Sequence, residues 1–283
     1  MMLGITELTY TALIAFLIVI IIGPIFIPML RKFKFGQTVR DDGPQTHLAK
    51  NGTPTMGGII MIVAILITGL TRVKVSHDMA VGLICIAGFG FIGFLDDFIK
   101  IKLKRSLGLK AYQKIILQVA LSFYVAFYQY TSSSSASQLM IPFTDFVINV
   151  GILYIPIMMF IIVAIVNAVN LTDGLDGLAS GVTLIVSVFF MLFASSIAGN
   201  TEVAVLAAAT VGACLGFLGF NSYPARVFMG DTGSMALGGA VVAFSVLTNS
   251  VLIIPIIGGI YFAEALSVLI QVGYFKATRK RFF

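Results

Sequence analysis

The chain is organised around the segment Asn167-Ala-Val-Asn-Leu-Thr-Asp-Gly-Leu-Asp-Gly-Leu-Ala-Ser-Gly181, which follows an apolar run from Val150 to Val166. The apolar run, with its flanks, is long enough to cross a bilayer. If the helix continues past it, four polar side chains recur at intervals of three and form a slowly winding stripe: Asn167, Asn170, Asp173 and Asp176. Such groups are costly to leave in hydrocarbon, so they indicate a site for a cation or a polar ligand. The two Asp-Gly pairs are also typical of turns, and a solvated loop is the alternative.

The composition is that of a membrane protein. Of the 283 residues, 59% are hydrophobic and 11% are charged, and the mean hydropathy is +1.04. Because a soluble domain is only about 45–50% apolar, we expect an all-α, polytopic membrane helical bundle that forms one integral-membrane domain over residues 1–283. Nine runs are candidate spans: Leu8–Leu30, Met56–Leu70, Met79–Leu95, Ile115–Tyr130, Val147–Val166, Leu178–Ile197, Val203–Phe220, Met235–Leu247 and Val251–Phe275.

Lysine and arginine gather in the odd-numbered connections between these spans, and this pattern predicts the orientation. If the N-terminus is outside, those connections lie in the cytoplasm, and only Arg72 and Lys74 fall on the other face. The net charge of +6 therefore reflects membrane topology, and we expect no nucleic-acid partner. The odd-numbered connections also contain seven acids, which are therefore expected on the same face of the membrane although topology does not require them: Asp41, Asp42, Asp96, Asp97, Asp173, Asp176 and Asp231.

The first cytoplasmic segment of interest runs from Gln37 to Gly58. It contains His47 and Lys50, followed by Gly-Thr-Pro-Thr-Met-Gly-Gly at the start of the second span. Glycines at the start of a helix let backbone N–H groups approach a phosphate, and Lys50 adds a positive charge. A capped helix start without any ligand is the alternative.

The second segment is the pair Asp96 and Asp97 at the end of the third span. Adjacent carboxylates repel each other unless a cation, a proton or a lysine relieves them. Their hard oxygen atoms suit Mg²⁺, which commonly binds one or two carboxylates together with substrate phosphate. One of the two could instead act as a general base. A solvated helix end with Lys100 as the partner is the simplest alternative.

The fourth segment, after the one around Asn167, runs from Asn221 to Ser234. Gly230 and Gly233 flank Asp231 directly before a span, which suits a metal-bound carboxylate beside phosphate-binding amides. Phe228 could stack on a flat base, although a lone phenylalanine more often anchors a loop at the membrane interface. Each segment is weak evidence alone, and together they gain force from lying on one side of the membrane.

These segments closely resemble the phospho-N-acetylmuramoyl-pentapeptide transferase family, which belongs to the polyprenyl-phosphate N-acetylhexosamine-1-phosphate transferase superfamily. The resemblance covers nearly the whole chain, with the order and spacing of the motifs intact. It is carried by Asp42-Gly43-Pro44 with His47 and Lys50, Gly52 to Gly58, Asp96-Asp97, Asn167 to Leu178, and Phe228 to Ser234.

The resemblance implies an Mg²⁺-dependent enzyme that transfers phospho-N-acetylmuramoyl-pentapeptide from UDP to undecaprenyl phosphate, giving lipid I and UMP for peptidoglycan synthesis. It also implies ten helices in a full member, a homodimer, and a cytoplasmic active site in the bacterial inner membrane. The implied catalytic residues are Asp96, Asp97 and Asp231, with Asp231 as the Mg²⁺ ligand. The implied substrate-binding residues are Lys50, Thr55, Lys114, Asn167, Asp173, Gly174, Leu175, Asp176, Asn221 and Phe228, with Phe228 stacking on uracil.

The sequence departs from the family at its end. Members continue with a cytoplasmic loop that carries histidines and with a last span, whereas the histidines here are His47 and His77. If the chain is shortened at Phe283, we expect it to have little or no activity compared with an extended version.

Three other functions fit parts of the sequence. A sister transferase would move N-acetylglucosamine-1-phosphate onto the same lipid, but the Gly-Thr-Pro-Thr-Met-Gly-Gly and Asn-Leu-Thr-Asp-Gly-Leu-Asp-Gly runs favour the muramoyl-pentapeptide enzyme. An ion-coupled transporter would use the acids as an ion pathway, yet only Glu264 is expected near mid-membrane depth. A non-catalytic lipid-binding scaffold is the third alternative, and Mg²⁺-dependent release of UMP would distinguish it from an enzyme.

Overall fold

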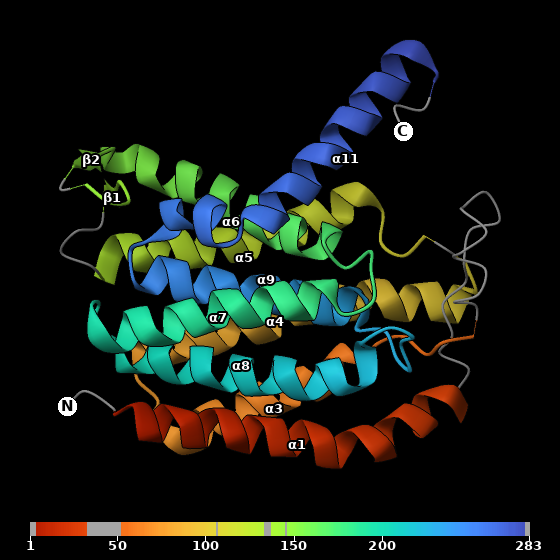
Figure 1. The fold of residues 1–283 in the computed structure, drawn as a ribbon. Helices are drawn as coiled ribbons and strands as arrows, with labels where there is room; N and C mark the ends of the chain where they lie inside the picture. The colour runs from red at the N-terminus through yellow and green to blue at the C-terminus, as the bar shows by residue number, and fades with distance from the viewer. Residues whose placement is uncertain (1–3, 33–51, 106, 133–136, 145, 281–283) are drawn as a thin grey trace.

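The computed structural model describes residues 4–32, 52–105, 107–132, 137–144 and 146–280 as a bundle of helices (Figure 1). The two short strands pair antiparallel, with Leu139 opposite Ile148. In chain order the elements are α1 (Ile5–Lys32), α3 (Gly58–Arg72), α4 (His77–Leu103), α5 (Ala111–Ser132), β1 (Gln138–Met140), β2 (Val147–Asn149), η1 (Gly151–Leu153), α6 (Tyr154–Leu171), α7 (Leu178–Ser196), α8 (Thr201–Asn221), α9 (Gly230–Leu247), η2 (Val251–Ile253), α10 (Ile254–Ile257) and α11 (Gly259–Thr278).

The prediction of an all-α polytopic membrane protein is confirmed. Within the described residues, six helices are long and apolar enough to cross a membrane, and the bent pair formed by η2–α10 and α11 is a seventh candidate. Each of the nine predicted spans contains a helix. However, α3 has only 15 residues, and α5 carries several buried or half-buried polar side chains along its length, among them Lys114, Gln118, Ser122 and Gln129. The count of nine spans therefore stays a prediction.

The centre of the bundle is formed by α8 and α9. In the most apolar stretch of each helix, 78% and 89% of the chain is buried, respectively. In lipid there is no hydrophobic drive between helices, so packing depends on small residues that let backbones approach. Gly239 of α9 illustrates this, because an added Cβ would lie 2.3 Å from the carbonyl oxygen of Cys85 on α4. On the other side of the bundle, Gly212 of α8 faces the backbone of α1 at Ala12 in the same way.

The segments expected to form the site meet at one end of the bundle. The C-terminal end of α4, the α6–α7 connection and the α8–α9 connection lie together on the right of Figure 1, whereas the start of α1 and the β1–β2 hairpin lie at the opposite end. This arrangement agrees with the prediction that the odd-numbered connections lie on one face of the membrane. The cytoplasmic location of that end remains a prediction.

Two local expectations were wrong. The helix before Asn167 does not continue as one stripe, because α6 ends at Leu171, and both Asp173 and Asp176 lie in the turn that follows. The Asp-Gly turn signals therefore outweighed the helical spacing. The predicted span from Val147 begins as strand β2, and the helix itself starts at Tyr154.

Candidate active site

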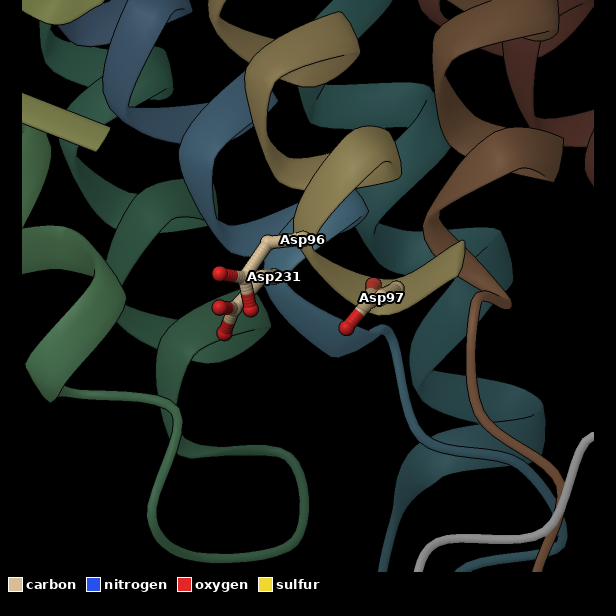
Figure 2. A group of neighbouring side chains, drawn as sticks. All are labelled: Asp96, Asp97 and Asp231. Atoms are coloured by element: carbon tan, nitrogen blue, oxygen red, sulfur yellow. The ribbon is translucent and has the colours of Figure 1, made fainter. Parts of the chain in front are cut away.

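Three carboxylates from two helices meet at this end of the bundle. Asp96 and Asp97 lie on the last turns of α4, and Asp231 lies on the first turn of α9. One oxygen atom from each lies within 4.8 Å of the others, as Figure 2 shows. The two α4 aspartates are buried, with 4% and 3% of their surface exposed. Helix packing thus brings Asp231 next to a pair of acids that lies more than a hundred residues earlier in the sequence.

A glycine on α4 makes this meeting possible. Gly93 lies one turn before Asp96, and a Cβ added to it would lie 2.0 Å from the carbonyl oxygen of Asp231. Only a residue without a side chain allows the start of α9 to approach α4 so closely. No role for this glycine was predicted from the sequence.

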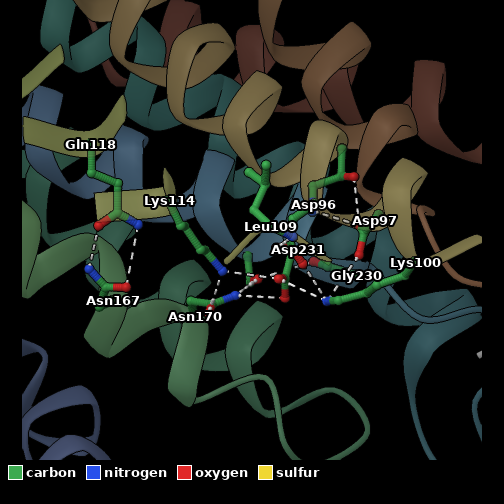
Figure 3. A network of polar contacts seen from close by, with 12 residues as sticks. Asp96, Asp97, Lys100, Leu109, Lys114, Gln118, Asn167, Asn170, Gly230 and Asp231 are labelled. Atoms are coloured by element: carbon green, nitrogen blue, oxygen red, sulfur yellow. Dashed lines mark hydrogen bonds and ion pairs between the residues drawn. The ribbon is translucent and has the colours of Figure 1, made fainter. Parts of the chain in front are cut away.

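Two lysines compensate the acids. The Nζ atom of Lys100 lies 2.6 Å from Oδ2 of Asp96, 3.0 Å from Oδ2 of Asp231 and 3.7 Å from Oδ1 of Asp97. Lys114 reaches the same Oδ2 of Asp231 at 3.0 Å (Figure 3). Two positive charges thus face three negative ones, and the cluster keeps a net charge of about −1 when all five groups are ionised.

Asp97 is held by the first turn of α9. Its Oδ2 accepts hydrogen bonds from the backbone N–H of Thr232 at 2.9 Å and from the Thr232 hydroxyl at 2.7 Å. Gly230 adopts a positive φ of 70°, and a Cβ there would lie 2.5 Å from Oδ2 of Asp97 and 2.7 Å from Oγ1 of Thr55. Thr55 therefore lies near Asp97, and its implied role in substrate binding stays a prediction.

Asp96 is held by the connection between α4 and α5. Its Oδ1 accepts a hydrogen bond from the backbone N–H of Leu109 at 2.9 Å. The neighbouring Gly108 lies so close that an added Cβ would be 2.6 Å from that oxygen. The two α4 carboxylates are therefore fixed by different partners and have different environments.

Asn170 joins α6 to the cluster. Its Nδ2 donates to Oδ1 of Asp231 at 3.1 Å and to Oγ of Ser234 at 2.7 Å, and its Oδ1 accepts from Lys114 at 3.5 Å. Asn167, one turn earlier, does not contact the three acids. Its side chain pairs instead with that of Gln118 on α5, through hydrogen bonds of 2.7 and 3.3 Å.

The glycines at the start of the second span have a different role from the one expected. Gly57 and Gly58 donate their backbone N–H groups to the carbonyl oxygens of Phe228 and Met229, at 2.9 and 3.0 Å, so these amides are not free for a phosphate. Phe228 in turn donates its own N–H to the carbonyl oxygen of Pro54 at 2.8 Å. A Cβ on Gly58 would lie 2.1 Å from the Cα of Gly233, so the glycines allow α3 and α9 to pack closely.

The amides around Asp231 are also used inside the protein. The N–H of Thr232 binds Asp97, and that of Gly233 donates to the carbonyl oxygen of Met229 at 3.3 Å. The N–H groups of Thr232 and Gly233 are therefore not free to bind phosphate. The carboxylates and lysines remain the groups that can meet a substrate.

The α6–α7 and α8–α9 connections are tied to each other. Oδ1 of Asn221 accepts from the N–H of Gly177 at 3.1 Å, and its Nδ2 donates to the carbonyl oxygen of Val227 at 3.0 Å. Oδ2 of Asp176 accepts from the N–H of Ala225 at 3.1 Å. Both residues thus shape the two loops on which the remaining predicted substrate-binding residues lie: Asp173, Gly174, Leu175 and Phe228.

Some predicted residues fall outside the described part of the chain. Lys50, His47, Asp41 and Asp42 are among them, so their relation to the carboxylates stays a prediction. Gly174 and Leu175 are exposed at the tip of the α6–α7 loop, Asp173 is half-buried there, and Phe228 is half-buried before α9.

Several residues of this site were not predicted from the sequence. Lys100 was considered only as a local partner of the α4 acids, although its spacing of three and four residues from them was visible. Asn170 was part of the expected stripe but was not assigned to the site. No pattern in the sequence pointed to Gln118, to the bond from Thr232 to Asp97 or to that from the backbone of Leu109 to Asp96, because each joins different elements of the fold.

The donor set fits a divalent cation. Three carboxylates offer hard oxygen atoms within a small volume, and Mg²⁺ prefers such ligands. Lys100 bridges the same three carboxylates, which is the electrostatic role that a bound cation would share. The combination of acids and lysines can bring anionic phosphates together by screening their charges.

Comparisons with known proteins agree in pointing to one family. A family model described as glycosyl transferase family 4 matches residues 79–249, and a phospho-N-acetylmuramoyl-pentapeptide-transferase signature matches residues 50–62. The phospho-N-acetylmuramoyl-pentapeptide-transferase of Alkaliphilus metalliredigens (strain QYMF) is 54% identical over 98% of this chain and 87% of its own length. The protein of the same name from Desulfitobacterium hafniense (strain DSM 10664 / DCB-2) is 50% identical over 96% of this chain and 85% of its own length.

Proposed function

Because the chain belongs to the phospho-N-acetylmuramoyl-pentapeptide-transferase family, we propose that it transfers phospho-N-acetylmuramoyl-pentapeptide from its UDP carrier to undecaprenyl phosphate, giving lipid I and UMP. The observation that carries this proposal is the meeting of Asp96, Asp97 and Asp231 with two lysines at one end of an apolar bundle. A lipid phosphate can reach a water-soluble diphosphate only at such an end.

The reaction joins two anions. An oxygen of the lipid phosphate forms a bond to the β-phosphorus of the UDP-sugar, the bond from that phosphorus to the bridging oxygen breaks, and UMP leaves with the electron pair. Phosphoryl transfer of this kind depends mainly on positioning and on electrostatic stabilisation. Lys100 and Lys114 screen the negative charge, while Asp96 and Asp97 position the lipid phosphate or accept its proton.

We propose Mg²⁺ as the cofactor, held by Asp231 with oxygen atoms of Asp96 or Asp97. When bound, the ion would neutralise phosphate charge that the two lysines leave uncompensated. The protein's own contribution is to keep the carboxylates in place. Thr232, Leu109 and Asn170 do this through the hydrogen bonds described above.

The nucleotide-sugar is proposed to bind beside this cluster, over the loops joined by Asn221 and Asp176. Lys50, Thr55, Asp173 and Phe228 complete the proposed site, with Phe228 stacking on uracil. The site would face the cytoplasm of a bacterial cell, where the nucleotide is available, and the protein would associate as a homodimer in the cell membrane.

The test is release of UMP by the purified protein in detergent. The chain is supplied with undecaprenyl phosphate and UDP-N-acetylmuramoyl-pentapeptide, with Mg²⁺ or with a chelator. Because the resemblance implies a further histidine loop and span, the 283-residue chain and a version extended by such a segment are assayed side by side. UMP release that needs Mg²⁺ and the lipid supports the proposal.

A control with a second nucleotide-sugar distinguishes this activity from that of the sister transferase. UDP-N-acetylglucosamine replaces the muramoyl nucleotide under the same conditions, and we expect no turnover with it. The proposal would be overturned if only UDP-N-acetylglucosamine were turned over. It would also be overturned if neither form of the chain turned over either nucleotide.

A further inference from the structure

Helix α5 has an unusual distribution of side chains. Its buried positions are Gln118, Ser122, Val125, Ala126 and Gln129, so three of the five are polar. Its large apolar side chains are exposed instead, among them Ile116, Phe123 and Phe127. Lipid accepts such apolar groups as readily as a protein core does, so apolar burial gives this helix little preference for one rotation about its axis. Polar contacts must supply that preference.

Besides Lys114, two polar residues tie α5 to neighbouring helices within the described part of the chain. Tyr128 donates to Oδ1 of Asp78 on α4 at 2.6 Å near the C-terminal end of α5, and Gln118, which is nearer to the carboxylate cluster, forms an amide pair with Asn167 of α6. The side chain of Gln118 is fully buried. Its Oε1 accepts from Nδ2 of Asn167 at 2.7 Å, and its Nε2 donates to Oδ1 of Asn167 at 3.3 Å. Nδ2 of Asn167 also donates to the carbonyl oxygen of Val163 at 2.8 Å, so both of its N–H bonds are used within the protein.

The pair lies one helical turn away from the carboxylate cluster on both helices. Lys114 precedes Gln118 by four residues on α5, and Asn170 follows Asn167 by three on α6, so each lies on the same face as its neighbour. Lys114 and Asn170 are the two residues that contact Asp231 from these helices, at 3.0 and 3.1 Å. Figure 3 shows the amide pair beside this second pair.

A small movement of α5 would separate Lys114 from Asp231. Successive residues of a helix are rotated by about 100° and rise by about 1.5 Å, so a slip of a single residue would turn Lys114 away from the carboxylate. Two reciprocal hydrogen bonds between planar amides allow only one such register. Of the contacts that tie α5 to its neighbours, the amide pair lies one turn from Lys114, whereas the Tyr128–Asp78 bond lies at the other end of the helix, so the amide pair is the contact that holds Lys114 within reach of the site.

We propose that Gln118 is a positioning residue for the transfer reaction: paired with Asn167, it fixes α5 against α6 so that Lys114 stays on Asp231. This inference rests on the proposed function, because Lys114 matters there as a group that screens phosphate charge. It gives Asn167 a positioning role, whereas the sequence resemblance implied that this side chain binds the substrate.

The experiment compares two glutamines of one helix. Gln118→Leu removes the amide pair, and Gln129→Leu is the matched control. Gln129 is also buried, with 7% of its surface exposed, and lies on the same face about 16 Å further along α5. Both variants are made in whichever form of the chain releases UMP, and thermal unfolding in detergent identifies any that fail to fold.

We expect Gln118→Leu to lower kcat by about 10- to 100-fold, as loss of a supporting hydrogen bond does at other sites, with little change in KM for the nucleotide-sugar. Gln129→Leu should leave kcat unchanged. In a Lys114→Met background the Gln118→Leu change should cost nothing further, because its effect acts through the lysine. The exchange of Gln118→Asn with Asn167→Gln, which keeps the combined length of the pair, should recover most of the loss.

The outcomes separate this inference from the proposed function. If the wild-type chain releases no UMP in either form, the proposed function fails first. If the wild type is active but the two leucine variants lose activity equally, or the losses of Gln118→Leu and Lys114→Met simply add, Gln118 serves only bundle stability and the inference is overturned.

Discussion

Replacement of Gly93 by alanine tests the close approach of α4 to α9. The added Cβ would lie 2.0 Å from the carbonyl oxygen of Asp231 and 2.4 Å from its carbonyl carbon, and real Cβ atoms essentially never approach other atoms within 3.0 Å. Both neighbours are backbone atoms, which cannot rotate away as a side chain can. The start of α9 must therefore move by about 1 Å relative to α4.

The size of the effect follows from what Asp231 contacts. Its carboxylate is 3.0 Å from Lys100, 3.0 Å from Lys114 and 3.1 Å from Asn170. A shift of about 1 Å breaks hydrogen bonds of this length, and misplacement on that scale costs about 100-fold in rate. Stability should change much less, because an overpacking cost of about 1–3 kcal/mol is opposed by a gain of about 1 kcal/mol from replacing glycine with alanine in a helix.

The assay is Mg²⁺-dependent UMP release, measured together with thermal unfolding in detergent. Gly88→Ala, on the same helix, is the first control, because its Cβ would meet only the end of the Leu121 side chain. Gly181→Ala on α7 is the second, since no atom lies within 4 Å of its added Cβ. Both controls should keep near-normal turnover. Turnover of Gly93→Ala within about twofold of the wild type would show that the contact does not position Asp231 and would refute the reasoning.

Three further changes probe the site. Asp231→Ala should abolish Mg²⁺-dependent turnover while the protein stays folded, and retained Mg²⁺-dependent UMP release would exclude this carboxylate as the metal ligand. Asp97→Asn should lower turnover by about 100-fold or more, because one carboxylate oxygen that accepts two bonds from Thr232 is replaced or reoriented; near-normal turnover would make Asp97 structural. Asn221→Leu should raise KM for the nucleotide-sugar more than it lowers kcat, since it releases the N–H of Gly177 and the two loops beside the cluster, and initial rates over a range of nucleotide concentrations would detect an opposite pattern.

Much of the architecture could be predicted from local patterns. Apolar runs of sufficient length predicted where helices would form, because in lipid every backbone polar group must be satisfied within its own segment. The parity of the connections predicted that the acids would gather at one end, and Asp96, Asp97 and Asp231 do so. The glycine-rich start of the second span was also recognised as special, although its amides bind carbonyl oxygens rather than phosphate.

The sequence by itself determined that this is a helical membrane protein with acids at one end, since hydropathy and spacing are properties of a single segment. Only the tertiary structure decided which partner each acid has. Lys100 and Asp231 are 131 residues apart, and Gln118 and Asn167 are 49 apart. Such contacts depend on the rotation and register of packed helices, and these are set by small residues such as Gly93 and by polar pairs between helices, which no one-dimensional pattern specifies.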